Sequence, residues 1–581
     1  MRDSSVVRRD TGLTRDSAAA RARNDSAALR ARKDSAAAAD TIKAALAQSE
    51  LPVLADPSGS YHWTRRTMFE SGALTVQDLL DRTPGLTGMR ANWIAQPMMS
   101  AYLGDPRRLR ISVDGFELEE LDPRMGRVWD LSQIPLWSLD DLVIERSASE
   151  VRLLLRTWRV ERTTPFTRTD IYTGDQATNL YRGLFGRRYR HGEVLQLAGQ
   201  QYSTTAGRFA ESSDQLGLMT RVGIGRPTWT ADAVLMRRNR HRGRNFSQTL
   251  GDTVPATESV RSDAYLRLAW FDTSRGAWAQ TLAGTSIYTH HAPDASSSST
   301  TADTGRSRSQ YVLTGGYNRG ALRASFTQRF LFGFGRHVAT QSARIGWDAP
   351  RLSLSAFGEG RGLDSTRRFD VSAVVRPIRV AYFAGSIGTE RPLSDSAGAP
   401  VFSRIEAGLR ARDLWLSGGV MHRDAVEVDP VAIVRSATPL RSDSAATGAF
   451  ATIRGRVWQA VYLDAHAVRW SDTTGAYRPQ YQTRTELYLS TSLLDRFPTG
   501  NFHIRASVVH EYRSTLLWPD TSGFTRVTGY RVFSTLLQFK IVSAEVFWNY
   551  RNTFDARYAE IPAYRRPRLT SIYGVRWEFW N

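Results

Sequence analysis

The sequence predicts an all-β transmembrane protein, an antiparallel β-barrel of about 22 strands, preceded by a small α+β domain and an Ala/Arg-rich N-terminal spacer. Three observations predict this fold class. Apolar and polar residues alternate along successive segments of 165–581, and long and short polar connections alternate between these segments. The chain also ends in an amphipathic strand that is rich in aromatic residues.

The composition of the 581-residue chain fits a barrel. Aromatic residues make up 10% of it although its mean hydropathy is negative, as expected where only alternate residues face lipid. No apolar run reaches the roughly 18 residues of a membrane-spanning helix. No secretory signal is visible from Met1 to Leu51, so either translation starts upstream of Met1 or the membrane interpretation is wrong.

The absence of cysteine excludes disulfides and thiolate metal sites and suits an oxidising envelope compartment. The formal charge of +20 comes almost entirely from arginine. A basic chain raises nucleic acid as a partner, but no nucleic-acid-binding module is present, so we expect no such partner. Arginine also grips carboxylate and phosphate in a bidentate fork, which fits lipopolysaccharide phosphates or an anionic solute. The only lysines are Lys33, Lys43 and Lys540.

Residues 1–59 are predicted to form a low-complexity periplasmic spacer. A repeat within 15–41 is rich in Ala and charge, and Leu29 is its only large apolar residue. Such a segment is helical by propensity but has no apolar face to bury. A spacer is therefore favoured over a partner-binding helix. The aspartates in register in the repeat are Asp16, Asp25 and Asp34.

A compact α+β domain is predicted at 60–162. A short helix is expected at Thr75–Leu80, because Thr75 can cap it and Asp78 lies in its first turn. Pro84-Gly85 ends this segment. The strands expected after it are Leu109–Val113, Phe116–Leu118 beyond a turn at Asp114-Gly115, and Leu142–Arg146 beyond Ile134-Pro135 and a polar turn at Ser138–Asp141.

The order of motifs in this domain resembles the plug domain of the TonB-dependent outer-membrane receptors. That family has an Asp-Leu-Leu helix before a Pro-Gly, a hydrophobic strand ending in Val-Asp-Gly, an Ile-Pro, and a strand ending in Glu-Arg. The resemblance implies a plug inside a barrel, TonB as a partner, and a structural role for the motif residues. These residues are Asp78, Leu79, Leu80, Pro84, Gly85, Leu86, Val113, Asp114, Gly115, Ile134, Pro135, Glu145 and Arg146.

Two departures from the family pattern predict a reduced plug. After Glu145-Arg146 the family has a glycine-rich segment, whereas here SASEVRLLLRTWRV follows directly and contains no glycine. No clear TonB box stands near the N-terminus, where LPVLAD from Leu51 is a weak candidate. The sequence therefore leaves open whether the barrel is coupled to TonB or is not energised.

The barrel is predicted at 165–581. In ALRASFTQRF, Phe326 and Phe330 share one face while Arg323 and Arg329 share the other. Charged residues are tolerable toward a wet lumen and costly toward lipid, so the parity assigns the two faces. Short connections are expected at Arg190–Gly192, Gly225–Thr228, Thr273–Gly276, Asn318–Gly320, Ala349–Arg351 and Arg376-Pro377. Long ones are expected at Ser203–Asp214, Arg242–Ser262, His290–Arg306, Thr389–Pro400, Arg423–Thr447, Thr515–Arg526 and Asn552–Arg566.

The last strand, LTSIYGVRWEFWN, places Tyr573 and Val575 on one face with two further aromatic residues. It resembles the closing strand of outer-membrane barrels, which has a Gly followed at +3 and +5 by aromatics. The resemblance implies recognition by the barrel-assembly machinery. The matching residues are Gly574, Trp577 and Phe579; Asn581 stands where the family has a terminal aromatic residue.

No catalytic motif is complete, so we expect no enzyme, no cofactor and no metal site. His510-Glu511 does not form a zinc-protease motif, because Ser514 stands where the second histidine would be. Asp464 and His466 fit wall polarity better than catalysis. Solvated loop residues are likewise favoured over a metal site for His290-His291, and Gly333 and Gly335 lack the strand–helix context of a dinucleotide loop.

A basic run is expected where one strand leaves the membrane on the outer side. Three interpretations remain: a solvated rim, lipopolysaccharide phosphate contact through charge-assisted bonds, or solute capture. Its residues are Arg237, Arg238, Arg240, Arg242 and Arg244.

Two classes of function are favoured, and a third is kept as an alternative. The first, implied by the resemblance, is a monomeric TonB-dependent receptor in the outer membrane that takes up a small-molecule solute. Lumen arginines favour an anionic solute, such as a metal chelate or an acidic oligosaccharide. The second is a barrel that is not energised and acts as a passive channel, a surface binder or an envelope scaffold. A soluble, glycan-handling β enzyme is the remaining alternative.

Overall fold

The computed structural model describes residues 61–580 except for 124, 126, 206–209, 247–252, 272–274, 292–303, 334, 364, 393–398, 429–430, 432–440, 495, 500 and 521–522. The spacer predicted at 1–59 lies outside the described residues. None of the helices within the described ranges is long and apolar enough to cross a membrane.

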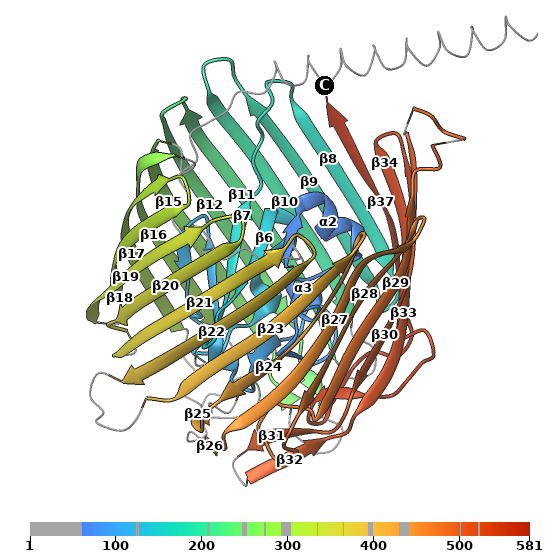
Figure 1. Cartoon of the computed structure of the whole chain (residues 1–581). Helices are drawn as coiled ribbons and strands as arrows, with labels where there is room; N and C mark the ends of the chain where they lie inside the picture. Colours follow the sequence, from blue (N-terminus) through green and yellow to red (C-terminus); the bar gives the residue numbers. More distant parts are fainter. Residues whose placement is uncertain are drawn as a thin grey trace, which may run out of the picture.

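A closed antiparallel barrel of 22 strands forms the wall, as predicted (Figure 1). The last strand pairs with both β34 and β8 and so closes the ring. In chain order the wall strands are β8 (Phe166–Gly174), β9 (Thr178–Arg188), β10 (Glu193–Thr205), β11 (Ser212–Gly225), β12 (Trp229–Arg242), β15 (Thr257–Trp270), β16 (Gly276–His291), β17 (Thr304–Arg319), β18 (Leu322–Gly333), β19 (Arg336–Asp348), β20 (Leu352–Arg361), β21 (Thr366–Ile378), β22 (Ala381–Pro392), β23 (Val401–Ala411), β24 (Leu414–Arg423), β27 (Ala446–Trp458), β28 (Val461–Trp470), β29 (Tyr481–Thr491), β30 (Phe502–Arg513), β33 (Tyr530–Ile541), β34 (Ala544–Arg551) and β37 (Thr570–Trp580).

Side chains alternate across this wall as the sequence indicates. In β18 the Phe326 and Phe330 rings are exposed on the outer surface, whereas Arg329 is buried inside. In β37 the outer surface carries Tyr573 and Trp577, both exposed. Large apolar side chains on the outside of a closed wall suit a lipid environment, and charged ones belong in the lumen. The protein is therefore an outer-membrane barrel.

The connections differ in length between the two ends of the barrel. The first wall strand, β8, begins at the end of the barrel with short turns, and the last wall strand, β37, finishes at that same end (Figure 1). The prediction of a turn at Arg376-Pro377 is wrong: both residues belong to β21, whose ladder is irregular between Val375 and Ile378. Proline lacks the N–H that a regular ladder needs, and an irregularity accommodates it. The opposite end carries two-stranded hairpins: β13 (Asn245–Phe246) with β14 (Thr253–Val254), β25 (Val426–Val428) with β26 (Arg441–Asp443), β31 (Leu516–Asp520) with β32 (Gly523–Val527), and β35 (Ala559–Ile561) with β36 (Tyr564–Arg565).

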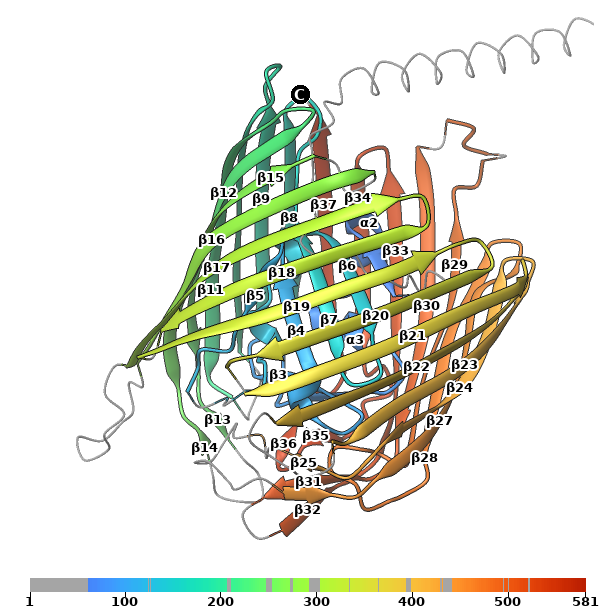
Figure 2. The ribbon, with the colours of Figure 1, turned by 60° about the vertical axis from the view of Figure 1, so that its left-hand side comes forward.

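The N-terminal α+β unit lies inside the barrel, where its blue elements are surrounded by the wall in both views (Figures 1 and 2). Its main sheet has the order β1-β6-β7-β4-β5, with β4 parallel to β7. A separate hairpin joins β2 and β3. The elements are β1 (His62–Thr64), α2 (Arg65–Glu70), α3 (Val76–Leu80), β2 (Leu86–Arg90), β3 (Met98–Tyr102), η1 (Pro106–Arg108), β4 (Leu109–Val113), β5 (Phe116–Leu118), η2 (Leu131–Gln133), η3 (Leu136–Ser138), β6 (Leu139–Arg146) and β7 (Val151–Thr157).

Local sequence explains several of these plug elements. Asp78 Oδ2 accepts from the backbone N–H of Thr75, the N-cap residue of α3, at 3.1 Å, which fixes where the helix begins, while the Thr75 hydroxyl makes no hydrogen bond. Asp114 and Gly115 both have positive φ, 52° and 90°, as the tight turn between β4 and β5 requires. The third strand begins at Leu139, three residues before the predicted start, because Leu139 already pairs with Thr157 of β7.

Plug–wall ion pairs as the candidate functional site

The interface between the plug and the inner face of the wall is built from arginine–carboxylate pairs. Successive residues of a strand point to opposite faces, so every second wall residue points at the plug. Many of these inward-pointing residues are arginines. Such pairs are strong because the guanidinium fork donates two parallel hydrogen bonds. The pairs that join plug to wall include Arg82–Glu486, Arg108–Glu390, Arg110–Glu359, Arg146–Glu406, Asp78–Arg551, Asp114–Arg221, Glu117–Arg329, Glu119–Arg308, Asp130–Arg240 and Glu145–Arg344.

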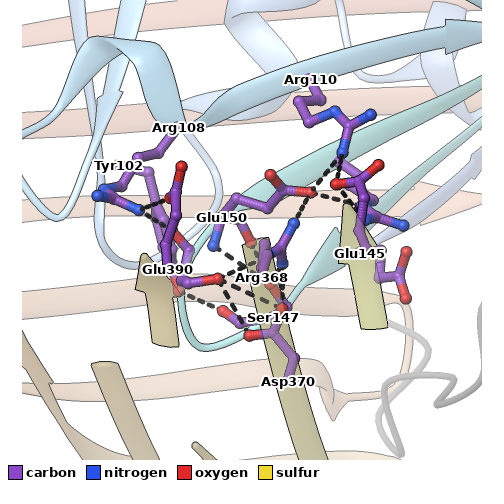
Figure 3. A network of polar contacts seen from close by, with 12 residues as sticks. Tyr102, Arg108, Arg110, Glu145, Ser147, Glu150, Arg368, Asp370 and Glu390 are labelled. Atoms are coloured by element: carbon purple, nitrogen blue, oxygen red, sulfur yellow. Dashed lines mark hydrogen bonds and ion pairs between the residues drawn. The ribbon is translucent and has the colours of Figure 1, made fainter. Parts of the chain in front are cut away.

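The turn between β6 and β7 is clamped to the wall by Arg368 of β21 (Figure 3). Arg368 Nε donates to Ser149 Oγ at 2.7 Å and its Nη2 donates to Ser147 Oγ at 2.7 Å. It also pairs with Glu150 of the plug. Burial alone would raise the pKa of the Glu150 carboxyl, but Arg368, Arg110 and Arg152 outweigh it and hold the pKa well below its usual range. The turn is thus held by an ion pair between Arg368 of the wall and Glu150 of the plug.

Asp114 of the Val-Asp-Gly motif is the second anchor. Its Oδ2 accepts from Arg221 Nη2 at 2.8 Å and from the Tyr265 hydroxyl at 2.6 Å, both of which belong to the wall. Burial would raise the pKa of this carboxyl, but the guanidinium groups of Arg159 and Arg221 hold it well below its usual range. The motif residue therefore fixes both a turn in the plug and the contact of that turn with the wall.

Glu486 of β29 is the third anchor and is fully buried. It accepts from Arg82 Nη1 of the plug at 2.7 Å. Two neighbouring wall arginines also reach it, Arg505 Nη2 at 3.0 Å and Arg484 Nη2 at 3.3 Å. Three guanidinium groups thus share one carboxylate, and one of the three comes from the plug. Arg484 also pairs with Glu511 at 3.3 Å.

Asp78, the first residue of the Asp-Leu-Leu motif, is held by Arg551 of β34 through a bidentate pair of 2.9 and 3.1 Å. Burial would raise its pKa, but Arg551 and Arg90 hold the pKa well below its usual range. These groups line a polar cavity of about 90 Å³ between plug and wall, together with Glu511 and Glu560.

The structure places the other motif residues in the plug itself. Leu79, Leu80 and Ile134 are buried in its core, and Gly85 adopts a positive φ of 87°. Glu145 and Arg146 contact the wall. Sequence reasoning missed the wall partners of all these residues, because no local pattern connects them. It also missed that the glycine-free segment after Arg146 supplies β7, which lies between β6 and β4 in the sheet.

The structure corrects the predicted outward position of three of the five arginines in the basic run, which lies in and just after β12. Arg238, Arg240 and Arg242 lie on the luminal face, where Arg238 pairs with Asp263 and Arg240 Nη1 donates to Asp130 Oδ2 of the plug at 3.1 Å. Alternate residues of a strand face opposite ways, so these three cannot reach lipopolysaccharide outside the barrel. Arg237 and Arg244 are exposed, and for them the lipopolysaccharide contact stays a prediction.

Replacing Arg240 with Met is expected to loosen the plug by about 2 kcal/mol, since it leaves the buried Asp130 carboxylate without its charged partner. Limited proteolysis of the plug in purified protein measures this. Arg237→Met is the matched control, because Arg237 lies three residues earlier on the outer face of the same strand, and it should leave the cleavage rate unchanged. Equal cleavage rates in the two variants would contradict the assignment of Arg240 to the plug contact.

A partly buried acidic group beside this contact gives the plug a pH dependence. Burial raises the pKa of Glu120 to about 7, with Arg261 opposing the shift and Asp122 adding to it. The ordinary value is about 4.3, so the stabilising contribution of the protonated carboxyl is present at low pH and is lost as the pH rises through 7. Glu120→Gln should therefore gain about 2 kcal/mol relative to the parent between pH 5 and pH 8. Urea unfolding at the two pH values measures it, and a constant difference would contradict it.

The remaining candidates do not assemble into a catalytic site. His510 packs against Phe533 on the outer face, whereas Glu511 lines the inner cavity. Asp464 pairs with Arg454 at 3.1 Å and His466 is buried beside them in the wall. Within the parts of the chain that the structure describes, no group of three or more His, Asp or Glu side chains is placed to hold a metal ion. The other candidates lie at strand ends: His290 and His291 close β16, and Gly333 and Gly335 flank the β18–β19 turn.

The outer end of the plug is covered by an apolar cluster. Met89 and Met99 of the β2–β3 hairpin are fully buried, and so is Tyr477 from a wall connection. Trp518 of β31 stacks edge-on against Tyr477 with ring centroids 5.1 Å apart. Hairpins at the end with long connections thus close over the plug.

No family model and no curated protein matches the sequence. Solved structures do. The FrpB iron transporter of Neisseria meningitidis in its apoprotein form superposes with a TM-score of 0.68 at 10% identity, over 90% of this chain and 99% of that one. A mutant of the ferric enterobactin receptor PfeA of Pseudomonas aeruginosa gives 0.67 at 10% identity, over 91% and 100%. The copper transporter OprC gives 0.68 at 13% identity, over 87% and 96%.

The chain has the fold of the TonB-dependent outer-membrane receptors. The superposition spans nearly the whole length of each neighbour, so it includes the plug as well as the wall of the receptor fold. At such low identity the agreement concerns architecture alone. The ion pairs described above are therefore properties of this chain's own side chains within that fold.

Proposed function

We propose that the protein is an outer-membrane receptor that takes up a solute through its plugged barrel, with TonB supplying the energy. The observation that carries this proposal is the plug itself, which occupies the lumen and is tied to the wall by buried ion pairs on several strands. A solute can pass only if some of these pairs break. Breaking one buried pair costs several kcal/mol, so passage through this interface needs an energy source.

The solute class follows from the charge of the lumen and from the neighbours. Inward-facing arginines favour an anionic solute, such as a metal chelate or an acidic oligosaccharide. The neighbours are an iron transporter, a ferric enterobactin receptor and a copper transporter, which supports a metal chelate. We further propose a monomer, assembled through the strand that carries Gly574, Trp577 and Phe579, with lipopolysaccharide around it and no enzymatic activity. We also propose that the plug domain spans 60–162 and that the barrel spans 165–581.

A disulfide between plug and wall tests whether the plug must move. A Cβ atom on Gly388 of β22 would lie 3.3 Å from the Cβ of Ala148 in the plug, close to the separation of about 3.5–4.5 Å in disulfides. The chain has no other cysteine. The double variant Ala148→Cys/Gly388→Cys should lose uptake of ferric chelates when oxidised and regain it after reduction.

The single variants serve as controls, because Gly388→Cys forces the Asp370 carboxylate aside and its effect must be known alone. Uptake that is unchanged in the oxidised double variant would overturn the proposal.

Depleting TonB distinguishes this proposal from the second candidate function, a barrel that is not energised. That candidate is favoured by the glycine-free segment after Arg146 and by the weak TonB box, and it predicts permeation that continues without TonB.

A further inference from the structure

A second cavity lies at the end of the lumen with short turns, where the chain passes from the plug to the wall. It has a volume of about 370 Å³. Arg159 and Val160 of the connecting segment form one side, and the inner faces of β9 to β12 form the other. Gln196 lies on the wall side and donates to the Trp158 carbonyl at 2.9 Å, while its own side-chain oxygen is buried without a hydrogen bond.

Arg188, the last residue of β9, points into this cavity and is only 4% exposed. Its one hydrogen bond is a long one, from Nη2 to the Gly225 carbonyl at 3.4 Å, and its Nε has no partner. Among the described residues no carboxylate oxygen lies within ion-pair distance of its guanidinium group. A buried cation is costly unless a counter-charge accompanies it, so this arginine lacks the anion that its position requires.

Glu161 of the connecting segment also lines the cavity, but it is exposed to solvent and forms no ion pair with Arg188. The other nearby carboxylates are paired with other arginines. Asp232 accepts from Arg267 Nε at 2.8 Å and from its Nη2 at 3.0 Å, and Asp114 is saturated by Arg221 and its other donors. Arg159 pairs with Asp114 at 3.6 Å and with Asp232 at 4.0 Å, so it shares both carboxylates with closer arginines. Burial, and then the Arg267 charge, lowers the pKa of Arg159 to about 10. Three arginines (Arg159, Arg188 and Arg221) and two carboxylates (Glu161 and Asp232) line the cavity, so positive charge exceeds negative charge there.

We propose that this cavity binds a small anion through Arg188, with Arg159 beside it, and that the ligand carries a carboxylate or phosphate group. The volume corresponds to about a dozen water molecules, which suits a di- or tricarboxylate or a phosphate ester. The site lies at the inner end of the lumen. If the proposed uptake function holds, it is the last site that an anionic solute meets before release, and this role alone rests on that function.

The absence of native cysteine makes a direct test simple. Val194 lines the cavity and pairs in register with Arg188, so Val194→Cys places a thiol beside the proposed site. Purified full-length protein is treated with anionic and cationic methanethiosulfonate reagents of similar size. A basic cavity with low-dielectric walls raises the local concentration of anions by about tenfold or more, so the anionic reagent should react about tenfold faster. Citrate or inorganic phosphate should slow it.

Arg188→Gln in the same background should abolish both the preference and the protection, whereas Arg188→Lys should retain them in part. Arg187→Gln is the matched control, since it removes the same charge from the outer face one residue away. Unheated gel migration verifies that each variant keeps the folded barrel. Equal rates for the two reagents, or protection that survives Arg188→Gln, would overturn the proposal. The assay needs no transport, so its outcome is independent of whether uptake itself is shown.

Discussion

Replacing Glu486 with Gln is expected to lower the free energy of unfolding by about 3–5 kcal/mol, the usual cost of removing one partner from a buried ion pair. The carboxylate is fully buried and forms ion pairs with Arg82, Arg484 and Arg505. Gln preserves the shape of the side chain but removes its charge. Three guanidinium groups would then remain close together without a buried anion between them.

Urea unfolding of the protein refolded in phospholipid vesicles measures this loss. Glu258→Gln is the matched control, because Glu258 is 58% exposed and lies 3.8 Å from His241. A surface pair of this kind is worth about 0–1 kcal/mol, so the control should unfold at nearly the parent midpoint. A loss below about 1 kcal/mol in Glu486→Gln would show that water or other groups compensate the arginines.

Replacing Asp114 with Asn is expected to cost about 3 kcal/mol at neutral pH, because Arg221 and Arg159 lose their shared anion. The folded-state pKa of Asp114 is depressed. Its stabilising contribution is therefore present above the unfolded-state value of about 4, and it is lost as the pH falls below that value toward the folded-state pKa. The gap between variant and parent should consequently narrow under acid.

Unfolding midpoints of parent and Asp114→Asn at pH 7 and at pH 3 check this expectation. The Tyr265→Phe variant removes a neutral donor to the same oxygen and serves as a control that should cost about 1 kcal/mol at both pH values. A gap for Asp114→Asn that is as wide at pH 3 as at pH 7 would mean that the carboxylate charge is not what holds the plug.

Strand parity accounts for what the sequence could predict of this fold. The period of two in β18 and β37 separates Phe326 and Trp577 from the luminal side chains without any knowledge of the tertiary structure. Cap and turn chemistry likewise locates α3 at Thr75 and the turn at Asp114-Gly115, since both depend on neighbours within a few residues.

The plug–wall pairs could not be predicted in this way. Arg82 and Glu486 are 404 positions apart, and which of many luminal arginines meets which carboxylate depends on the rotation of the plug within the ring. The sequence alone, however, could have prevented the wrong prediction for the basic run. Arg238 and Arg240 share the parity of Asp232, and a charged run that keeps the luminal parity belongs to the interior.

The most direct test of the account is the ion conductance of the full-length protein in planar lipid bilayers. We expect no steady current from the parent, because the plug and its ion pairs close the lumen. Asp114→Asn should show transient openings as its plug loosens. A steady, ohmic current through the unmodified protein would contradict the account and establish a passive channel in place of a gated receptor.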